Sequence, residues 1–190
     1  MKILLIGPPG SGKGTQGERL AERFGIEHIA AGDLLRAEVS AQTPLGRKAE
    51  SIMQRGELVP DEVVLDLLLP KIMSAADGNG YVLDGFPRSV EQAVEARKLA
   101  EQEGASPQAV LYLDAPREEL VRRIIERAES EDRSDDNEET VANRLRVFDE
   151  ATEPLVDYYR GRGLLHMINA DQDEDAVAAE ILEAVGADRR

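Results

Sequence analysis

Short apolar runs alternate along this chain with longer stretches in which apolar residues recur every three or four positions. The apolar runs are typical of buried strands, at Lys2–Ile6, Tyr81–Leu83, Ala109–Leu113 and Leu164–Ile168, with a weaker candidate at Glu27–Ala30. The amphipathic stretches predict helices over Gly14–Phe24, Asp33–Ser40, Pro44–Arg55, Asp61–Ser74, Ser89–Gln102, Arg117–Glu129, Asn137–Tyr159 and Asp173–Val185. Strands that alternate with helices favour an α/β fold of three layers, in which a central five-stranded parallel sheet is covered on both faces.

Two regions interrupt this alternation. Residues ~31–60 are helical without a strong strand, and residues ~128–137 (AESEDRSDDN) are polar and acidic. We find no internal repeat and no low-complexity linker, so residues 1–190 are expected to form a single domain. Both regions are expected at the carboxyl edge of the sheet, where open α/β sheets bind ligands.

Composition narrows the class of protein further. With 42% hydrophobic residues the chain can bury a core, and without cysteine it cannot form disulfides, thiolate metal sites or a cysteine nucleophile. No apolar run approaches the roughly 20 residues needed to span a bilayer, and residues 3–6 begin a strand rather than a signal peptide. We therefore expect a cytoplasmic protein.

The charge of the chain argues against polyanionic partners. A formal net charge of -15 repels nucleic-acid backbones and anionic membranes, so we expect neither as a partner. Of the 23 basic residues 18 are Arg, whose planar fork grips phosphate groups bidentately. We attribute the overall acidity to genome composition or a saline cytoplasm rather than to function.

A glycine-rich loop follows the first strand directly and opens the first helix. The segment Gly7–Thr15 (GPPGSGKGT) can curl its backbone N–H groups around one anion at a helix N-terminus, with Lys13 pairing the β- and γ-phosphates of a nucleotide. It departs from the strict phosphate-loop pattern, because Gly14 stands where Ser or Thr is expected and Thr15 follows. The pattern alone fits GTPases, ATPase motors and small-molecule kinases, although the guanine-selecting Asn-Lys-x-Asp motif is absent.

A second group of residues, Leu83–Arg88 (LDGFPR), ends the Tyr81 strand. If the Tyr81 strand neighbours the first strand, Asp84 lies close to the phosphate loop and is placed to be a partner of Mg²⁺ near nucleotide phosphates. A turn or helix cap would also explain it. Gly85 permits a close backbone approach, and Pro87 stiffens the turn that aims Arg88.

Four further segments follow the glycine-rich loop in order along the chain. They are AGDLLR at 31–36, GELVP at 56–60, LDGFPRSVEQA at 83–93, which contains the second group, and the stretch from Arg123 through DRSDDNEET to Arg144. Together they resemble the nucleoside monophosphate kinase family, most closely adenylate kinases with a short lid. The resemblance implies a P-loop core (1–29, 60–127 and 137–190), a helical clamp for the monophosphate (30–59) and a short lid (128–136). It also implies reversible, Mg²⁺-dependent transfer of a phosphoryl group from ATP to AMP, giving two ADP.

A zinc-binding lid is excluded, because Arg127 and Arg133 are only six positions apart and no Cys is present. A monomer is expected.

The resemblance also implies roles for particular residues. Transfer between two nucleotides needs in-line positioning and positive charge, without a general base. The catalytic set would be Lys13, Arg88, Arg127, Arg133 and Arg144. The ATP site would contain Gly10, Ser11, Gly12, Lys13, Gly14, Thr15, Arg123, Arg127 and Gln172, with Arg123 against the adenine. The AMP site would contain Ala31, Arg36, Glu57, Leu58, Val59, Gly85, Phe86, Pro87, Arg88, Gln92, Arg133 and Arg144, and Asp84 would hold Mg²⁺ through water. Ion pairs along a helix would also explain Arg123, Arg127 or Arg144 taken singly.

Two residues disagree about the acceptor base. Ala31 resembles UMP/CMP kinases, since adenylate kinases most often have threonine there. Gln92 resembles adenylate kinases, and its amide matches N1 and N6 of adenine. We give Gln92 more weight, because a buried polar group rejects a wrong partner more strongly than a missing methyl or hydroxyl does. The alternatives are a UMP/CMP kinase and a nucleotide-binding sensor without turnover.

Overall fold

The computed structural model describes residues 1–130 and 138–186 of the chain. Its strands form one five-stranded, fully parallel sheet in the order β2-β3-β1-β4-β5. They are β1 (Lys2–Ile6), β2 (Glu27–Ala30), β3 (Tyr81–Asp84), β4 (Ala109–Asp114) and β5 (Leu165–Asn169). All five predicted strands are confirmed, with ends that differ by no more than one residue.

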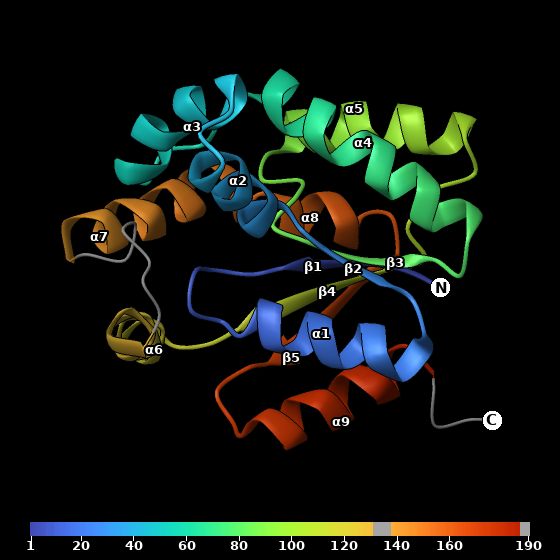
Figure 1. Cartoon of the computed structure of the whole chain (residues 1–190). Helices are drawn as coiled ribbons and strands as arrows, with labels where there is room; N and C mark the ends of the chain where they lie inside the picture. The colour runs from blue at the N-terminus through green and yellow to red at the C-terminus, as the bar shows by residue number, and fades with distance from the viewer. Residues whose placement is uncertain (131–137, 187–190) are drawn as a thin grey trace.

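Helices cover both faces of the sheet, which confirms the three-layer α/β prediction (Figure 1). Alternate residues of β1 face opposite ways: Leu4 and Ile6 belong to one core cluster, Ile3 and Leu5 to the other. The first cluster includes residues of α4 (Asp61–Asp77), α5 (Val90–Gln102) and α8 (Leu155–Arg160). The second includes residues of α1 (Lys13–Phe24) and α9 (Glu174–Ala184).

The other helices gather towards the carboxyl ends of the central strands (Figure 1). They are α2 (Ala31–Ser40), α3 (Pro44–Gln54), α6 (Arg117–Ser130) and α7 (Glu138–Val147). Residues of α6 and α7, among them Ile124 and Leu145, form a small apolar cluster of their own. These helices therefore surround the sheet edge where ligands are expected.

The prediction of one continuous helix over Asn137–Tyr159 is wrong. After α7 the chain widens into a π-helical turn (η1, Phe148–Thr152), in which the Glu153 N–H donates to the Phe148 carbonyl oxygen at 2.9 Å, and α8 begins at Leu155. The cause is Pro154, which has no N–H to donate and whose ring conflicts with a regular helical turn before it.

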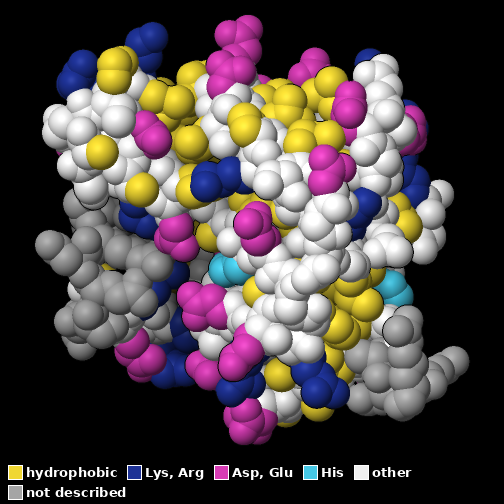
Figure 2. All heavy atoms as spheres, turned by 45° about the vertical axis from the view of Figure 1, so that its right-hand side comes forward, with side chains coloured by type: hydrophobic (Ala, Val, Ile, Leu, Met, Phe, Trp, Pro, Cys, Tyr) yellow, Lys and Arg dark blue, Asp and Glu magenta, His cyan; other side chains and the backbone are white. Residues whose placement is uncertain are grey.

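The surface in Figure 2 carries Asp and Glu side chains dispersed among basic and apolar ones. Within the described ranges, no helix combines the length and the apolar character that crossing a membrane requires.

Candidate active site

A cavity of about 780 Å³, which we name the main cavity, lies at the carboxyl ends of β1 and β3. A side cavity of about 60 Å³ adjoins it beside α2 and the start of α5. The two share part of their lining: Gly32, Arg36, Gly56, Leu58, Gly85, Arg88 and Arg144. One continuous site therefore has room for two ligands that meet at these shared residues.

The glycine-rich loop forms the floor of the main cavity between β1 and α1. Gly12 caps α1 with a φ of 87°, a left-handed conformation that favours glycine. A Cβ at Gly12 would meet nothing within 4 Å, so backbone conformation rather than crowding calls for glycine there. The N-terminus of α1 thus opens onto the cavity, an arrangement that attracts anions.

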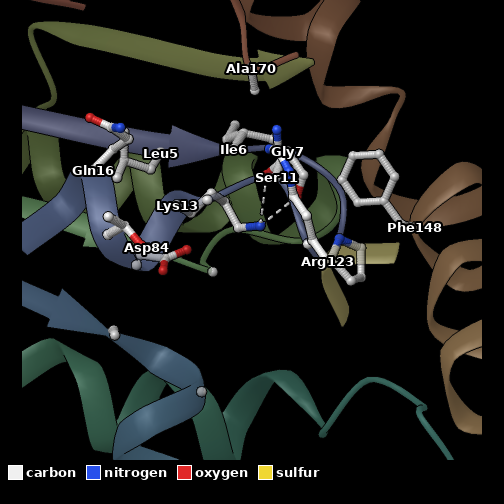
Figure 3. Close-up of a pocket in the computed structure, with 18 of the residues that line it drawn as sticks. Leu5, Ile6, Gly7, Ser11, Lys13, Gln16, Asp84, Arg123, Phe148 and Ala170 are labelled. Atoms are coloured by element: carbon white, nitrogen blue, oxygen red, sulfur yellow. Dashed lines mark hydrogen bonds between the residues drawn. The ribbon is translucent and has the colours of Figure 1, made fainter. Parts of the chain in front are cut away.

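Lys13 is the half-buried cation of this loop. Its Nζ donates to the carbonyl oxygens of Gly7 and Pro8, each at 2.9 Å, and lies 3.4 Å from Ser11 Oγ (Figure 3). Burial lowers the pKa of Lys13 to about 8; Asp84 opposes this shift, and the nearby charges of Arg88, Arg144 and Arg127 add to it. An anionic ligand would favour the charged form of this lysine.

Four predicted arginines line the main cavity from separate elements: Arg36 from α2, Arg88 from the loop before α5, Arg127 from α6 and Arg144 from α7. Arg88 Nε donates to the Gly85 carbonyl oxygen at 2.7 Å, and Arg36 Nη2 donates to Asp33 Oδ1 at 2.5 Å. The structure therefore brings these four predictions together with Lys13. Arg133, predicted with them, lies outside the described residues.

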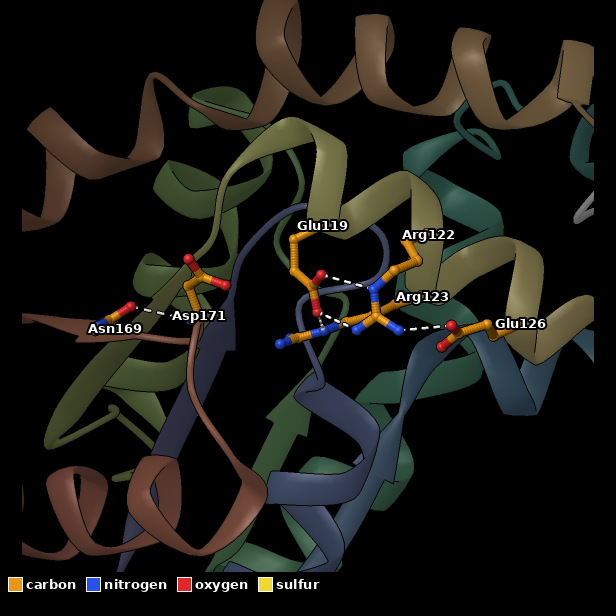
Figure 4. Close-up of polar contacts among 6 residues, drawn as sticks. All are labelled: Glu119, Arg122, Arg123, Glu126, Asn169 and Asp171. Atoms are coloured by element: carbon orange, nitrogen blue, oxygen red, sulfur yellow. Dashed lines mark hydrogen bonds and ion pairs between the residues drawn. The ribbon is translucent and has the colours of Figure 1, made fainter.

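The predicted adenine neighbours of ATP, Arg123 and Gln172, also line the main cavity. Arg123 Nε donates to Glu119 Oε1 at 2.6 Å, and Arg122 donates to the same carboxylate (Figure 4). These hydrogen bonds lower the pKa of Glu119 to about 2, so the carboxylate that holds Arg123 stays ionised at neutral pH. Gln172 Nε2 donates to the Asn169 carbonyl oxygen at 2.8 Å and to Glu180 Oε2 at 2.7 Å.

The side cavity is lined by the two residues that indicate different acceptor bases. Gln92 and Ala31, each 2% exposed, both line it. Ala31 offers only a methyl group, whereas Gln92 offers an amide. The other predicted AMP residues on its wall are Glu57, Leu58, Val59, Gly85, Arg36, Arg88 and Arg144.

Phe86 and Pro87 behave differently from each other. Pro87 lines the main cavity, but the side chain of Phe86 is 2% exposed within the apolar core and lines neither cavity. The side chain of Phe86 thus anchors the turn in the apolar core.

Asp84 is the predicted metal partner. It ends β3, faces the main cavity and lies near Lys13 (Figure 3). No group of three or more His, Cys, Asp or Glu side chains in the described parts of the chain is placed to hold a metal ion. Mg²⁺ is usually held by one or two carboxylates together with substrate phosphates and waters, so a single carboxylate beside a phosphate loop fits this ion.

Sequence reasoning missed several residues of the site. Phe148 and Thr152 of η1 line the main cavity, and Thr152 Oγ1 donates to the Arg88 carbonyl oxygen at 2.7 Å. Neither belongs to a motif, so nothing in the sequence indicates this contact. Asp33 also lines the cavity, and its place at the start of a predicted helix was the available signal.

Known proteins resemble this chain over most of its length. The family model described as adenylate kinase matches residues 5–164. Adenylate kinase of Xanthomonas campestris is 46% identical over 186 residues, covering 98% of this chain and 100% of that protein. Adenylate kinase of Thermus thermophilus is 45% identical, with 97% of this chain and 96% of that protein covered. Adenylate kinase isoenzyme 1 of Gallus gallus is 43% identical, with 94% of this chain and 91% of that protein covered.

Proposed function

The chain belongs to the adenylate kinase family, and from this premise we propose how its two cavities are used. The protein is an ATP:AMP phosphotransferase, which converts ATP and AMP reversibly into two ADP. ATP occupies the main cavity with its phosphates on the glycine-rich loop, and the base of AMP occupies the side cavity. The observation that carries this assignment is the convergence of Lys13 with Arg36, Arg88, Arg127 and Arg144 where the two cavities join.

The chemistry is a displacement at phosphorus. An oxygen of the AMP α-phosphate forms a bond to the γ-phosphorus of ATP, while the bond from that phosphorus to the β,γ-bridging oxygen breaks and ADP leaves. Arg36 and Arg88 hold the AMP phosphate, whereas Lys13, Arg127 and Arg144 stabilise the charge of the phosphoryl group in transit. Arg123 and Gln172 border the adenine of ATP.

Asp84 would hold Mg²⁺ through water, and the ion would supply charge neutralisation at the phosphates of ATP. The carboxylate also faces Lys13, so it helps to keep that ammonium charged beside three arginines. Zinc has no role in this proposal.

Residues 30–59 act as the clamp over AMP. The lid over ATP is assigned to residues 128–136 with Arg133, most of which lie outside the described residues. Keeping water away from the two nucleotides prevents hydrolysis of ATP. The enzyme acts as a monomer in the cytoplasm on ATP, AMP and ADP.

The test is a labelling experiment with Mg·ATP carrying ³²P at the γ-position. With AMP present, the label should move into ADP, and without AMP little inorganic phosphate should be released. Rapid release of labelled inorganic phosphate that AMP does not suppress would contradict the proposal.

A further inference from the structure

Asp61 contacts the buried amide of Gln92 from outside the side cavity. We infer that Asp61 sets the base preference of this cavity by fixing which way the Gln92 amide points. The inference rests on the proposed AMP site, and it assigns a positioning role to a residue that does not line the cavity itself.

Both polar atoms of the Gln92 amide have a protein partner. Oε1 accepts from the backbone N–H of Arg88 at 2.6 Å, and Nε2 donates to Asp61 Oδ1 at 2.5 Å. The position of the side chain is also constrained, because its backbone N–H donates to the helix-capping hydroxyl of Ser89 at 3.2 Å. With 2% of its surface exposed, Gln92 cannot exchange these partners for water.

The two partners have opposite and fixed polarity. A backbone N–H only donates, and an ionised carboxylate only accepts. If the Gln92 amide turned over, its NH₂ group would face the Arg88 N–H and its oxygen would face the Asp61 carboxylate. Both contacts would then be repulsive, so the oxygen stays on the Arg88 side and the nitrogen on the Asp61 side.

Each amide atom keeps one unused hydrogen-bonding position. Oε1 has a second lone pair and Nε2 a second hydrogen, and these can read a base that presents an amino group beside an unprotonated ring nitrogen. Adenine presents this pattern at N6 and N1. Hypoxanthine presents the reverse, an oxygen at position 6 beside a protonated N1, and would leave buried polar groups opposed to one another. Discrimination between AMP and IMP therefore reports the orientation of this amide directly.

The neighbouring residue provides a matched control. Asp61 and Glu62 are both acidic residues in the first turn of α4, where either stabilises the helix through its dipole. Glu62 is exposed, and among the described contacts only Asp61 accepts from Gln92. Glu62→Ala therefore removes the same charge from the same helix end without affecting the amide.

The experiment measures kcat/KM for AMP and for IMP, with Mg·ATP, in the wild type and in Asp61→Ala, Glu62→Ala, Gln92→Ala and the Asp61→Ala/Gln92→Ala double variant. We expect the AMP/IMP ratio to fall at least ~5-fold in Asp61→Ala and to stay unchanged in Glu62→Ala. In the Gln92→Ala background, Asp61→Ala should change the ratio no further, because its effect passes through Gln92. Asp61→Asn, which keeps an acceptor oxygen of the same shape but can also turn its amide, should lie between wild type and Asp61→Ala.

An AMP/IMP ratio that stays at the wild-type value in both Asp61→Ala and Asp61→Asn would overturn the role of Asp61 while leaving the AMP site intact. If Asp61→Ala does not fold, Asp61→Asn alone decides, and a wild-type ratio in that variant overturns the inference. A Gln92→Ala variant that retains the full AMP/IMP ratio would instead overturn the AMP site itself, and the role of Asp61 with it.

Discussion

At the scale of single residues, the site gathers basic side chains from separate elements within an acidic molecule. The chain has a formal net charge of -15, yet the main cavity gathers Lys13, Arg88, Arg127 and Arg144 closely enough for the arginines to lower the pKa of the lysine. An anionic ligand would add a counter-charge to these cations beyond the one that Asp84 supplies to Lys13. The free protein is therefore prepared for phosphates before they arrive.

Arg88 provides the sharpest test of this arrangement. Arg88→Ala should lower kcat by ~10²–10⁴, because the cation that holds the attacking AMP phosphate in line is lost, while the KM for ATP changes far less. The matched control is Arg97→Ala on α5, whose guanidinium pairs with Glu101 at 2.7 Å and lines neither cavity. Steady-state kinetics check this, and near-normal turnover of Arg88→Ala would remove its assigned role.

The pKa of Lys13 makes ATP binding depend on pH. In the free protein the pKa of Lys13 is about 8, and bound phosphates raise it. At a pH between the pKa of the free protein and that of the complex, the complex therefore holds more protons than the free protein. ATP binding should therefore take up protons around pH 8.5, and affinity should fall as the pH rises through this region. Titration calorimetry in two buffers of different ionisation enthalpy measures the uptake.

Lys13→Met is the control for that titration, since it should show no such uptake. Equal proton uptake by this variant and the wild type would assign the effect to another group.

The positions of site residues could be predicted where they follow from a local motif. The phosphate-loop residues, Asp84 and Arg88 are positioned by the turns in which they occur, so the sequence alone placed them. The contacts of Thr152 with Arg88 and of Asp61 with Gln92 join segments far apart in the chain and follow only from tertiary packing. Phe86 belongs to a motif, but its side chain lies in the apolar core. Membership of a motif therefore does not decide which way a side chain points.

At the scale of elements, the phosphate loop is fitted closely against α6. Gly10 has a φ of 85°, and a Cβ there would lie 2.6 Å from the Leu120 carbonyl oxygen and 3.0 Å from Ile124 Cγ1. This glycine is thus required both by the backbone conformation and by the approach of the helix.

Gly10→Ala should lower the free energy of unfolding by ~2–4 kcal/mol, from backbone strain and overpacking together. The melting temperature should fall by ~4–16 °C. Gly14→Ala is the comparison, because a Cβ there meets nothing within 4 Å and alanine favours the helix. Equal melting temperatures for the two variants would contradict the close fit of the loop against α6.

The order and type of most elements could be predicted from the chain, because strands buried on both faces and amphipathic helices leave clear patterns. The exception, η1, shows the limit of periodicity. The pattern of apolar residues continues through Phe148, but Pro154 removes a hydrogen bond and the helix widens before it. Giving Pro154 more weight than the periodicity would have corrected the prediction.

At the scale of the whole molecule, topology joins motifs that are distant in sequence. In the order β2-β3-β1-β4-β5, Leu5 of β1 pairs with Asp84 of β3, which brings the phosphate loop and the Asp84–Arg88 turn to one edge. The Asp84 strand was expected near the loop only on the condition that the two strands are neighbours. The sheet fulfils that condition.

Net charge also belongs to this scale. The chain has 38 acidic and 23 basic residues, and the excess of negative charge repels itself. Salt should screen this repulsion, so the melting temperature should rise between low and about 1 M KCl. Differential scanning calorimetry of the ligand-free protein measures this. A melting temperature that is flat across that range would show that the acidic surface costs the fold little.

We propose that the two cavities transfer a phosphoryl group to AMP because Gln92 reads adenine. The most direct test measures initial rates of transfer from Mg·ATP to AMP, UMP, CMP and GMP. We expect kcat/KM for AMP to exceed that for each other acceptor at least ~10-fold. A preference for UMP, which presents an oxygen beside a protonated ring nitrogen, would contradict the claim: Ala31 rather than Gln92 would then identify the acceptor, while the fold and the phosphate loop would stand. A preference for CMP, whose amino group and unprotonated ring nitrogen match the same amide, would contradict AMP as the acceptor without removing Gln92 as the reader.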